Sequence, residues 1–146
     1  MSPPFYSGNE SWVFTATALD QLCGHHAGLA TATLGPAEPP LFMVYAPRRD
    51  ATGAPFGVRT SPGSHALVVT ETRAIITHDP HRADRAPTAH VAAWDDVLAV
   101  EIGEALTLGW LSLVVRRHDH LAGLAIPFAA TGIEHFRAVV RWWRQR

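Results

Sequence analysis

Histidine is the residue type with the most potential chemistry in this chain. The sequence holds nine histidines, and four of them, His78, His81, His118 and His120, fall in two segments that read as turns. Imidazole is a common zinc ligand, but zinc needs three or four ligands at about 2.0–2.2 Å. Neither pair has the spacing of two ligands on one helix, and there is no H-E-x-x-H motif or cysteine pair. We therefore expect no metal or cofactor, and these histidines become candidate ligands only if the two turns meet.

The only cysteine, Cys23, lies close to His25 and His26 in the sequence. A thiol beside an imidazole is a candidate nucleophile, although a buried thiol that acts as a small apolar side chain is the interpretation we favour. Asp95 and Asp96 are adjacent in a predicted turn, so their carboxylates point in different directions. The G-x-S-x-G motif and glycine-rich phosphate loops are absent. We therefore expect no enzymatic activity.

All twelve basic residues are arginine. Arg48, Arg49 and Arg59 fall in one irregular segment, and guanidinium groups that converge in this way can bind phosphate in a bidentate manner. They are candidate anion ligands, but the strand that follows, Ala66–Glu71, carries no basic residue, so we do not expect tight phosphoinositide binding. The net charge of -1 and the pI near 6.7 give no reason to expect nucleic-acid binding.

The clearest element that could position these residues is a helix over residues 131–146, which read TGIEHFRAVVRWWRQR. Thr131 and Glu134 have the spacing of a capping box, and arginines in the last turn complement the helix dipole. Apolar residues recur at steps of three and four, which places them on one narrow face that must be buried. That face consists of Ile133, Phe136, Val140 and Trp143.

Two tryptophans are candidate interface residues. Trp142 lies about 100° from Trp143 around the helix axis, outside the apolar face. We therefore predict that Trp142 is exposed, and that its replacement by glutamate leaves stability nearly unchanged. Trp94 lies in a predicted turn, Trp94–Asp96. Exposed aromatic side chains near arginine are enriched at protein interfaces, so we assign Trp142 and Trp94 to a contact with a protein partner or a second copy.

About seven strands are predicted between residues 41 and 128, from β-branched runs bounded by turn residues. Ala66–Glu71 and Arg73–His78 are so close that they form an antiparallel hairpin, and Pro127 places the last strand at a sheet edge or a strand end. Residues 47–65 are either a functional loop or hold a short strand near Phe56–Arg59. The other strands are Leu41–Ala46, Thr88–Ala93, Val97–Ile102, Trp110–Arg116 and Leu124–Phe128.

Residues 1–40 read as an N-terminal extension to a domain of residues 41–146. The extension has few apolar residues, and proline-containing breaks separate it from the strands. Its one predicted element is a short helix that starts at Thr17–Asp20, continues through His26 and is stopped by Gly28. Because so little of the extension could be buried, we expect a chain that begins at Pro40 to remain folded.

Composition indicates a globular, cytoplasmic protein. The chain of 146 residues is 47% hydrophobic and 17% charged, which suits one folded domain. A single cysteine fits a reducing compartment. We predict no signal peptide and no transmembrane segment, because Glu101 and Glu104 interrupt the longest apolar stretch. The abundance of alanine, glycine and proline without lysine indicates a GC-rich bacterial genome.

Three stretches of the chain resemble the pleckstrin-homology-like (PH-like) family, in its bacterial and GRAM-type branch: ALVVTETRAII, AAWDDVLAVEIGEALTLGWLSL and LAIPFAATGIEHFRAVVRWW. The resemblance covers residues 41–146 and implies a mainly β fold, a small antiparallel barrel of about seven strands capped by one helix. A lipocalin-like or other small β-barrel is the alternative fold.

The same resemblance implies a non-catalytic binding or assembly module, acting through protein interaction or self-association. Lipid-binding members of the wider family use a basic cluster on the first two strands, which this chain matches only in part. The alternative function is a small β-barrel that binds a metal or a small ligand through its histidine-bearing loops.

Overall fold

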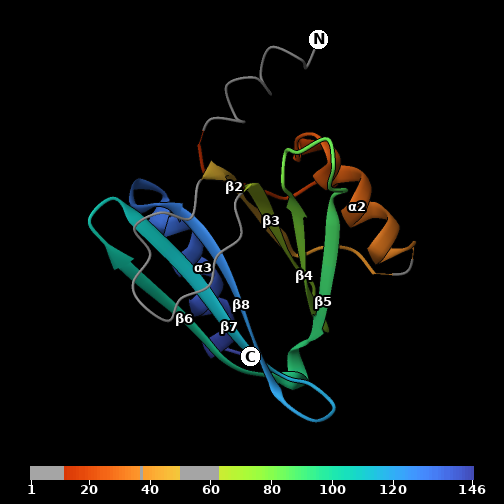
Figure 1. Ribbon diagram of the computed structural model, residues 1–146. Coiled ribbons are helices and arrows are strands. Elements are labelled where there is room, and N and C mark those ends of the chain that lie inside the picture. Colours follow the sequence, from red (N-terminus) through yellow and green to blue (C-terminus); the bar gives the residue numbers. More distant parts are fainter. Residues whose placement is uncertain (1–11, 37, 50–62) are drawn as a thin grey trace.

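Two antiparallel sheets make up most of the structure, a computed structural model that describes residues 12–36, 38–49 and 63–146 (Figure 1). The first sheet has the order β1 (Phe14–Ala16), β2 (Phe42–Arg49), β3 (Gly63–Val69), β4 (Arg73–Asp79) and β5 (Thr88–Ala93). The second contains β6 (Val97–Ala105), β7 (Leu108–Arg116) and β8 (Leu121–Ala129). The helices are α2 (His25–Leu34) and α3 (Ile133–Arg144), and the 3-10 turns are η1 (Leu19–Gln21), η2 (Trp94–Asp96) and η3 (Ala130–Gly132). The predicted mainly β fold with a C-terminal helix is confirmed.

The main core lies between the two sheets and α3. Strand alternation turns one set of side chains from each sheet toward this space, and α3 adds three buried residues. The aromatic rings of Phe128 on β8 and Phe136 on α3 stack with centroids 4.2 Å apart. This cluster fixes the position of α3 against the strands. Its largest fully buried members are Trp94, Phe128, Phe136, Leu67, Leu111, Leu113 and Ile126.

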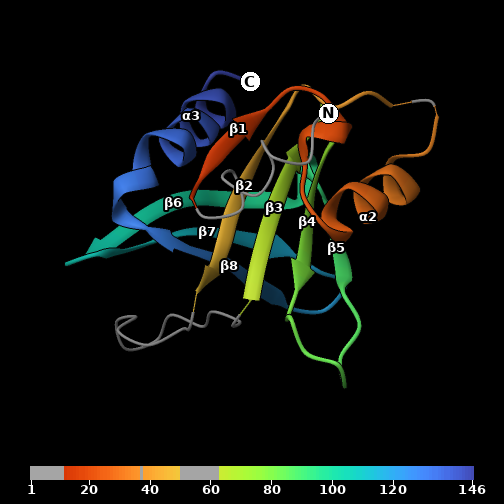
Figure 2. The same cartoon turned by 90° about the horizontal axis from the view of Figure 1, so that it is seen from above.

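A second core lies on the opposite face of the five-stranded sheet, where α2 covers it (Figure 2). Leu22, Ala30 and Leu34 pack there against side chains of β2, β3 and β4. Every residue of β3 is buried as a result, because a central strand that is covered on both faces has no solvent side. Figure 2 also shows α2 and α3 on opposite sides of the molecule.

The predicted strands agree well with those observed, and the differences have local causes. The hairpin of β3 and β4 is confirmed, and Pro127 lies on β8, which pairs only with β7 among the described strands. The strand predicted to end before Pro47 runs on to Arg49, with a register shift that accommodates the proline. The predicted connection Gly103–Gly109 is largely paired strand. The segment Phe56–Arg59 lies outside the described residues.

Residues on both sides of the predicted division at residue 40 pack together. β1 pairs with β2 in antiparallel register, and Val13 belongs to the main core. The predicted short helix has the wrong bounds, because α2 begins at His25 and continues through Gly28 to Leu34. A glycine inside a helix costs only about 1 kcal/mol, which the packing of α2 on the sheet offsets.

The C-terminal helix forms as predicted, but two details of its surroundings differ. Thr131 lies within η3, and Gly132 occupies the N-cap position without a side-chain hydrogen bond, so the predicted capping box is wrong. The carboxylate of Glu134 instead pairs with the guanidinium of Arg137. The buried face is also wider than predicted, since Val139 is fully buried together with Phe136.

The two candidate interface tryptophans contact each other. Trp94 is only 1% exposed, and its indole Nε1 donates a hydrogen bond to the carbonyl oxygen of Thr70 at 2.9 Å. The ring of Trp142 packs against that of Trp94 with centroids 4.9 Å apart, and the guanidinium of Arg146 lies over both rings. Trp94 is therefore a core residue rather than a surface one, and Trp142 is half-buried on the edge of the same cluster.

Replacing Trp142 by glutamate should therefore destabilise the protein, contrary to the expectation from helix geometry. The change removes the ring contact with Trp94 and places a carboxylate beside the apolar core, at a cost of about 2–4 kcal/mol. Urea unfolding monitored by circular dichroism measures this loss. The matched change Arg141→Glu on the exposed side of the same helix should cost about 1 kcal/mol, because it reverses a charge that complements the helix dipole. Equal losses for both variants would contradict the role of Trp142 in the core.

Candidate functional site

A chain of buried polar side chains lies between the start of α2 and the five-stranded sheet. The imidazole of His26 has Nδ1 at 2.7 Å from Thr77 Oγ1 and Nε2 at 2.7 Å from Ser64 Oγ. The same Ser64 oxygen lies 2.8 Å from Nε2 of His81. His26, Ser64 and Thr77 are all less than 3% exposed. They are brought together by α2, β3 and β4, with His81 in the segment after β4.

Asp79, at the end of β4, lies beside this row of polar side chains. Its carboxylate accepts a hydrogen bond from the main-chain N–H of His81 at 2.9 Å and lies 2.9 Å from Nδ1 of His25. Gly63 allows β3 to approach this corner closely, because its φ is +123° and a Cβ there would lie 2.2 Å from the carbonyl oxygen of Asp79. Only glycine suits that conformation and that contact.

Burial controls the protonation of two histidines in this region. It lowers the pKa of His26 to about 4, against the opposing influence of the Asp79 charge, so the ring is neutral at pH 7. It also lowers the pKa of His65 to about 3. His65 stacks on His78 with ring centroids 4.6 Å apart, and its buried Nδ1 has no hydrogen-bond partner among the described residues.

A cavity of about 200 Å³ opens beside the polar chain. Its wall combines imidazole, hydroxyl, phenol, thiol, carboxylate and guanidinium groups. The residues that line it are Cys23, Gly24, His26, Tyr45, Arg48, Ser64, Asp79 and His81. Of the three residues considered as a candidate nucleophile group, Cys23 and His26 both line this cavity, but both ring nitrogens of His26 are bonded to hydroxyl oxygens.

The two predicted histidine turns do not meet. The segment with His81 and the β7–β8 turn with His118 and His120 lie at opposite ends of the molecule in Figure 1. His120 bonds to the neighbouring Asp119, and both side chains are exposed. Within residues 12–36, 38–49 and 63–146, no group of three or more histidine, cysteine, aspartate or glutamate residues is placed to hold a metal ion.

Of the three candidate anion ligands, the structure places one at the polar cavity. Arg48 is exposed near the end of β2 and lines the polar cavity. Arg49 is the last residue of the same strand, and Arg59 lies outside the described residues. The structure thus brings one of the three arginines to a site that also contains His81 and Ser64, which sequence reasoning did not connect with it.

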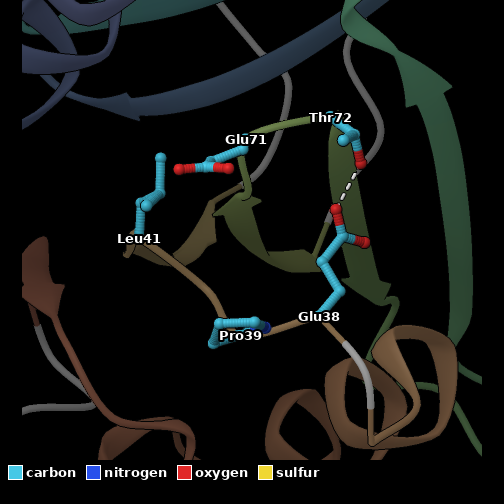
Figure 3. Close-up of a pocket in the computed structure, with 5 residues that line it drawn as sticks. All are labelled: Glu38, Pro39, Leu41, Glu71 and Thr72. Atoms are coloured by element: carbon cyan, nitrogen blue, oxygen red, sulfur yellow. Dashed lines mark hydrogen bonds between the residues drawn. The ribbon is translucent and has the colours of Figure 1, made fainter.

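A second hollow, of about 410 Å³, lies where the α2–β2 connection meets the β3–β4 turn (Figure 3). Glu38 spans that junction, since its carboxylate accepts hydrogen bonds from Thr70, Thr72 and the guanidinium of Arg73. The hydrogen bond from Thr72 is the main reason that the pKa of Glu38 falls to about 2. These polar groups are hydrogen-bonded to one another, so we interpret them as contacts that hold the α2–β2 connection against the β3–β4 turn.

A third hollow, of about 300 Å³, is a groove between β6 and α3. Ile102 and Val140 supply apolar side chains, and three arginines complete its lining: Arg137, Arg141 and Arg144. Arg137 is paired with Glu134, but neither of the other two arginines has an ion-pair partner in the described part of the chain. The groove therefore carries uncompensated positive charge beside apolar surface.

Comparisons with known proteins do not add to these sites. No family model matches the chain, and neither the curated proteins nor the solved structures include a significant match. Among the described helices, none has the length and apolar character needed to cross a lipid bilayer.

Proposed function

We propose that the protein is a non-catalytic PH-like binding module that recognises an acidic segment of a protein partner. The order of its elements supports the class: four sequential strands, β2–β5, are followed by three more, β6–β8, and then by helix α3. That is the order of strands and helix that the resemblance implies. β1 and α2 are additions that cover the edge and the outer face of the first sheet.

The proposal that the partner is an acidic protein segment rests on the groove between β6 and α3. Arg141 and Arg144 lie one turn apart on an exposed helix face, so their guanidinium groups can pair with two carboxylates on one segment. Ile102 and Val140 give that segment an apolar surface to cover. Because β6 pairs only with β7 among the described strands, its free edge offers main-chain hydrogen bonds to an extended peptide.

Binding without catalysis is supported by the polar chain at His26. A general base works best when its pKa lies near the working pH, whereas burial holds the pKa of His26 at about 4. We also expect no tight phosphoinositide binding, because Arg48 is the one member of the candidate basic cluster that lines a described cavity. We place this activity in a bacterial cytoplasm.

A charge-reversal experiment tests the proposed partner. The probe is a fluorescein-labelled ten-residue peptide in which glutamate and valine alternate, and fluorescence anisotropy measures its binding. The double variant Arg141→Glu with Arg144→Glu should bind it about tenfold more weakly or worse, since each exposed ion pair contributes about 0.2–1 kcal/mol and reversal adds repulsion. A matched peptide with lysine in place of glutamate should not bind the unaltered protein.

The control variant makes the same charge change elsewhere. Arg116→Glu with Arg117→Glu alters the β7–β8 turn, which lies outside the groove, and should bind the glutamate probe within about twofold of the unaltered protein. Equal weakening by both double variants would mean that peptide binding depends only on the net charge of the protein. That result would refute binding in the groove. Sedimentation of the protein alone identifies a second copy as the partner if the mass rises with concentration and falls in the Arg141 and Arg144 variant.

A further inference from the structure

The polar cavity beside α2 lies on the other side of the molecule from the arginine groove. Its volume of about 200 Å³ equals that of about seven water molecules at roughly 30 Å³ each, so it suits a small ion rather than a peptide. Ser64 is 1% exposed and lies deep in it, whereas Arg48 is exposed and lies where the cavity meets solvent. The cavity thus extends from a buried hydroxyl to a surface cation.

The hydroxyl of Ser64 can direct its one hydrogen-bond donor into the cavity. A hydroxyl has one donor and two acceptor sites, and its oxygen lies between Nε2 of His26 and Nε2 of His81, at 2.7 and 2.8 Å. If both rings carry their proton on Nε2, both N–H groups donate to Ser64. The one hydroxyl proton of Thr77 then donates to Nδ1 of His26 at 2.7 Å instead of to the carbonyl oxygen of Ala66 at 3.4 Å. The hydroxyl proton of Ser64 is then left to donate to an acceptor inside the cavity.

The cavity wall also offers a cationic group to a negatively charged acceptor. Among the described residues, the guanidinium of Arg48 has neither a hydrogen bond nor an ion-pair partner, so its five N–H donors are available. The one carboxylate in the wall, that of Asp79, is already engaged by His25 and by the main-chain N–H of His81. A guanidinium and a hydroxyl donor that face one space are the groups that bind oxyanions.

The fold itself does not require these buried polar groups. Apolar side chains would fill the space between α2 and the sheet without the desolvation that holds His26 neutral. Sites where a chain departs from the choice that favours stability tend to be functional. Gly63, with its φ of +123°, lets the β3 backbone lie close to Asp79, where a Cβ would be 2.2 Å from the Asp79 carbonyl oxygen.

We propose that this cavity binds a small oxyanion, a phosphate or a carboxylate, between the guanidinium of Arg48 and the hydroxyl of Ser64. On binding, the Ser64 proton turns from an imidazole nitrogen to the anion. Of its two histidine partners, the one that accepted this proton changes tautomer. Its own ring proton leaves Nδ1 and a proton is taken up at Nε2, both exchanged with water, so that the charge of the ring does not change and Nε2 becomes a donor to Ser64. The bound state therefore has a tautomer signature in the rings of His26 and His81.

The test uses the full chain with two probes, inorganic phosphate and acetate, at fixed pH and ionic strength. Isothermal titration calorimetry measures binding, and long-range ¹H–¹⁵N spectra of the histidine rings report the tautomers. We expect saturable binding of at least one probe and a shift of the Nε2 resonance of His26 or His81. Arg48→Gln should weaken binding at least tenfold, while Arg82→Gln, which removes an exposed arginine paired with Asp84, should change it less than twofold.

Each outcome decides between the alternatives. Saturation by phosphate alone or by acetate alone assigns the anion class, and saturation by both assigns a general oxyanion site. Co-sedimentation with phosphatidylcholine vesicles that contain phosphatidic acid, if lost in Arg48→Gln, identifies a lipid phosphate as the source. No saturable binding, equal binding by the Arg48 and Arg82 variants, or unchanged histidine resonances at saturation would overturn the proposal. Ser64→Ala should abolish the resonance shift; if that variant does not fold, Arg48→Gln still decides.

Discussion

A chain that begins at Pro40 should not unfold cooperatively, because the first forty residues contribute to both cores. Their loss removes the partner of the β2 edge and the helix that covers Met43, Val68 and Ile75, each of which is fully buried. Burial of one large apolar side chain is worth about 1.5–3 kcal/mol. The loss of Leu22, Leu34 and their neighbours is then roughly 5–10 kcal/mol, which is comparable with the whole stability of a typical domain.

Thermal and urea unfolding followed by circular dichroism measure this effect. The matched control is a chain that begins at Trp12, which keeps β1 and α2 and should unfold with the midpoint of the full chain. A sharp transition in the Pro40 variant, with the urea dependence scaled only to its shorter length, would restore the division between an extension and a separate domain.

Acidification from pH 6.5 to about 4.5 should lower the free energy of unfolding by roughly 3–5 kcal/mol. In the folded protein burial holds the pKa of His26 at about 4 and that of His65 at about 3, against the ordinary value of 6.5. The unfolded chain therefore takes up protons below pH 6.5 that the folded chain does not bind, and stability falls as the pH falls. Each pH unit in this window is worth about 1.4 kcal/mol per histidine.

This pH window separates the histidines from the carboxylates. Glu38 has its pKa lowered from 4.5 to about 2, so its contribution is fully present above pH 4.5 and is lost only below that value. Urea unfolding at pH 7, 6, 5 and 4.5 therefore reports the buried imidazoles. His65→Leu should reduce the slope of the unfolding free energy against pH by about half. It should not reduce stability at pH 7, because it removes a buried nitrogen that has no partner among the described residues.

The exposed His118→Gln is the control for the acid response, and it should leave the slope unchanged. An undiminished slope in His65→Leu would mean that other groups take up the protons. The same measurement made on Arg48→Gln would show whether the anion site and the acid response are separate, since Arg48 is not among the charges that act on either buried histidine.

Much of the second half of the fold could be predicted from local pattern. Thr88–Ala93 is a strand with the predicted bounds, and the hairpin of β3 and β4 follows from two β-branched runs. The predicted connection at Gly103 was wrong because glycine usually marks a break. Here Gly103 lies in β6, where a Cβ would be 2.2 Å from the indole of Trp110, so the residue makes room for a ring from the neighbouring strand.

The N-terminal region and the polar cavity could not be predicted in the same way. α2 has little amphipathic pattern, since it is rich in alanine and small residues throughout, and small side chains can pack on a sheet from any face. His26, Ser64 and Thr77 come from three elements far apart in the sequence, so no spacing links them. Trp142 was misplaced because the covered part of α3 is wider than a narrow stripe. Its exposed residues are Glu134, Arg137, Arg141 and Arg144, and the others are buried or half-buried.

The contact between the first strand and the last helix has a consequence for synthesis on the ribosome. Val13 packs against Gly132, where a Cβ would lie only 2.5 Å from the valine side chain, and Thr15 Oγ1 is 2.8 Å from Nδ1 of His135. Residues made early therefore reach their final contacts only after α3 has left the exit tunnel. Until then the apolar side chains that α3 covers, Val13 among them, are exposed to water, and the nascent chain is a natural substrate for a chaperone that binds apolar segments.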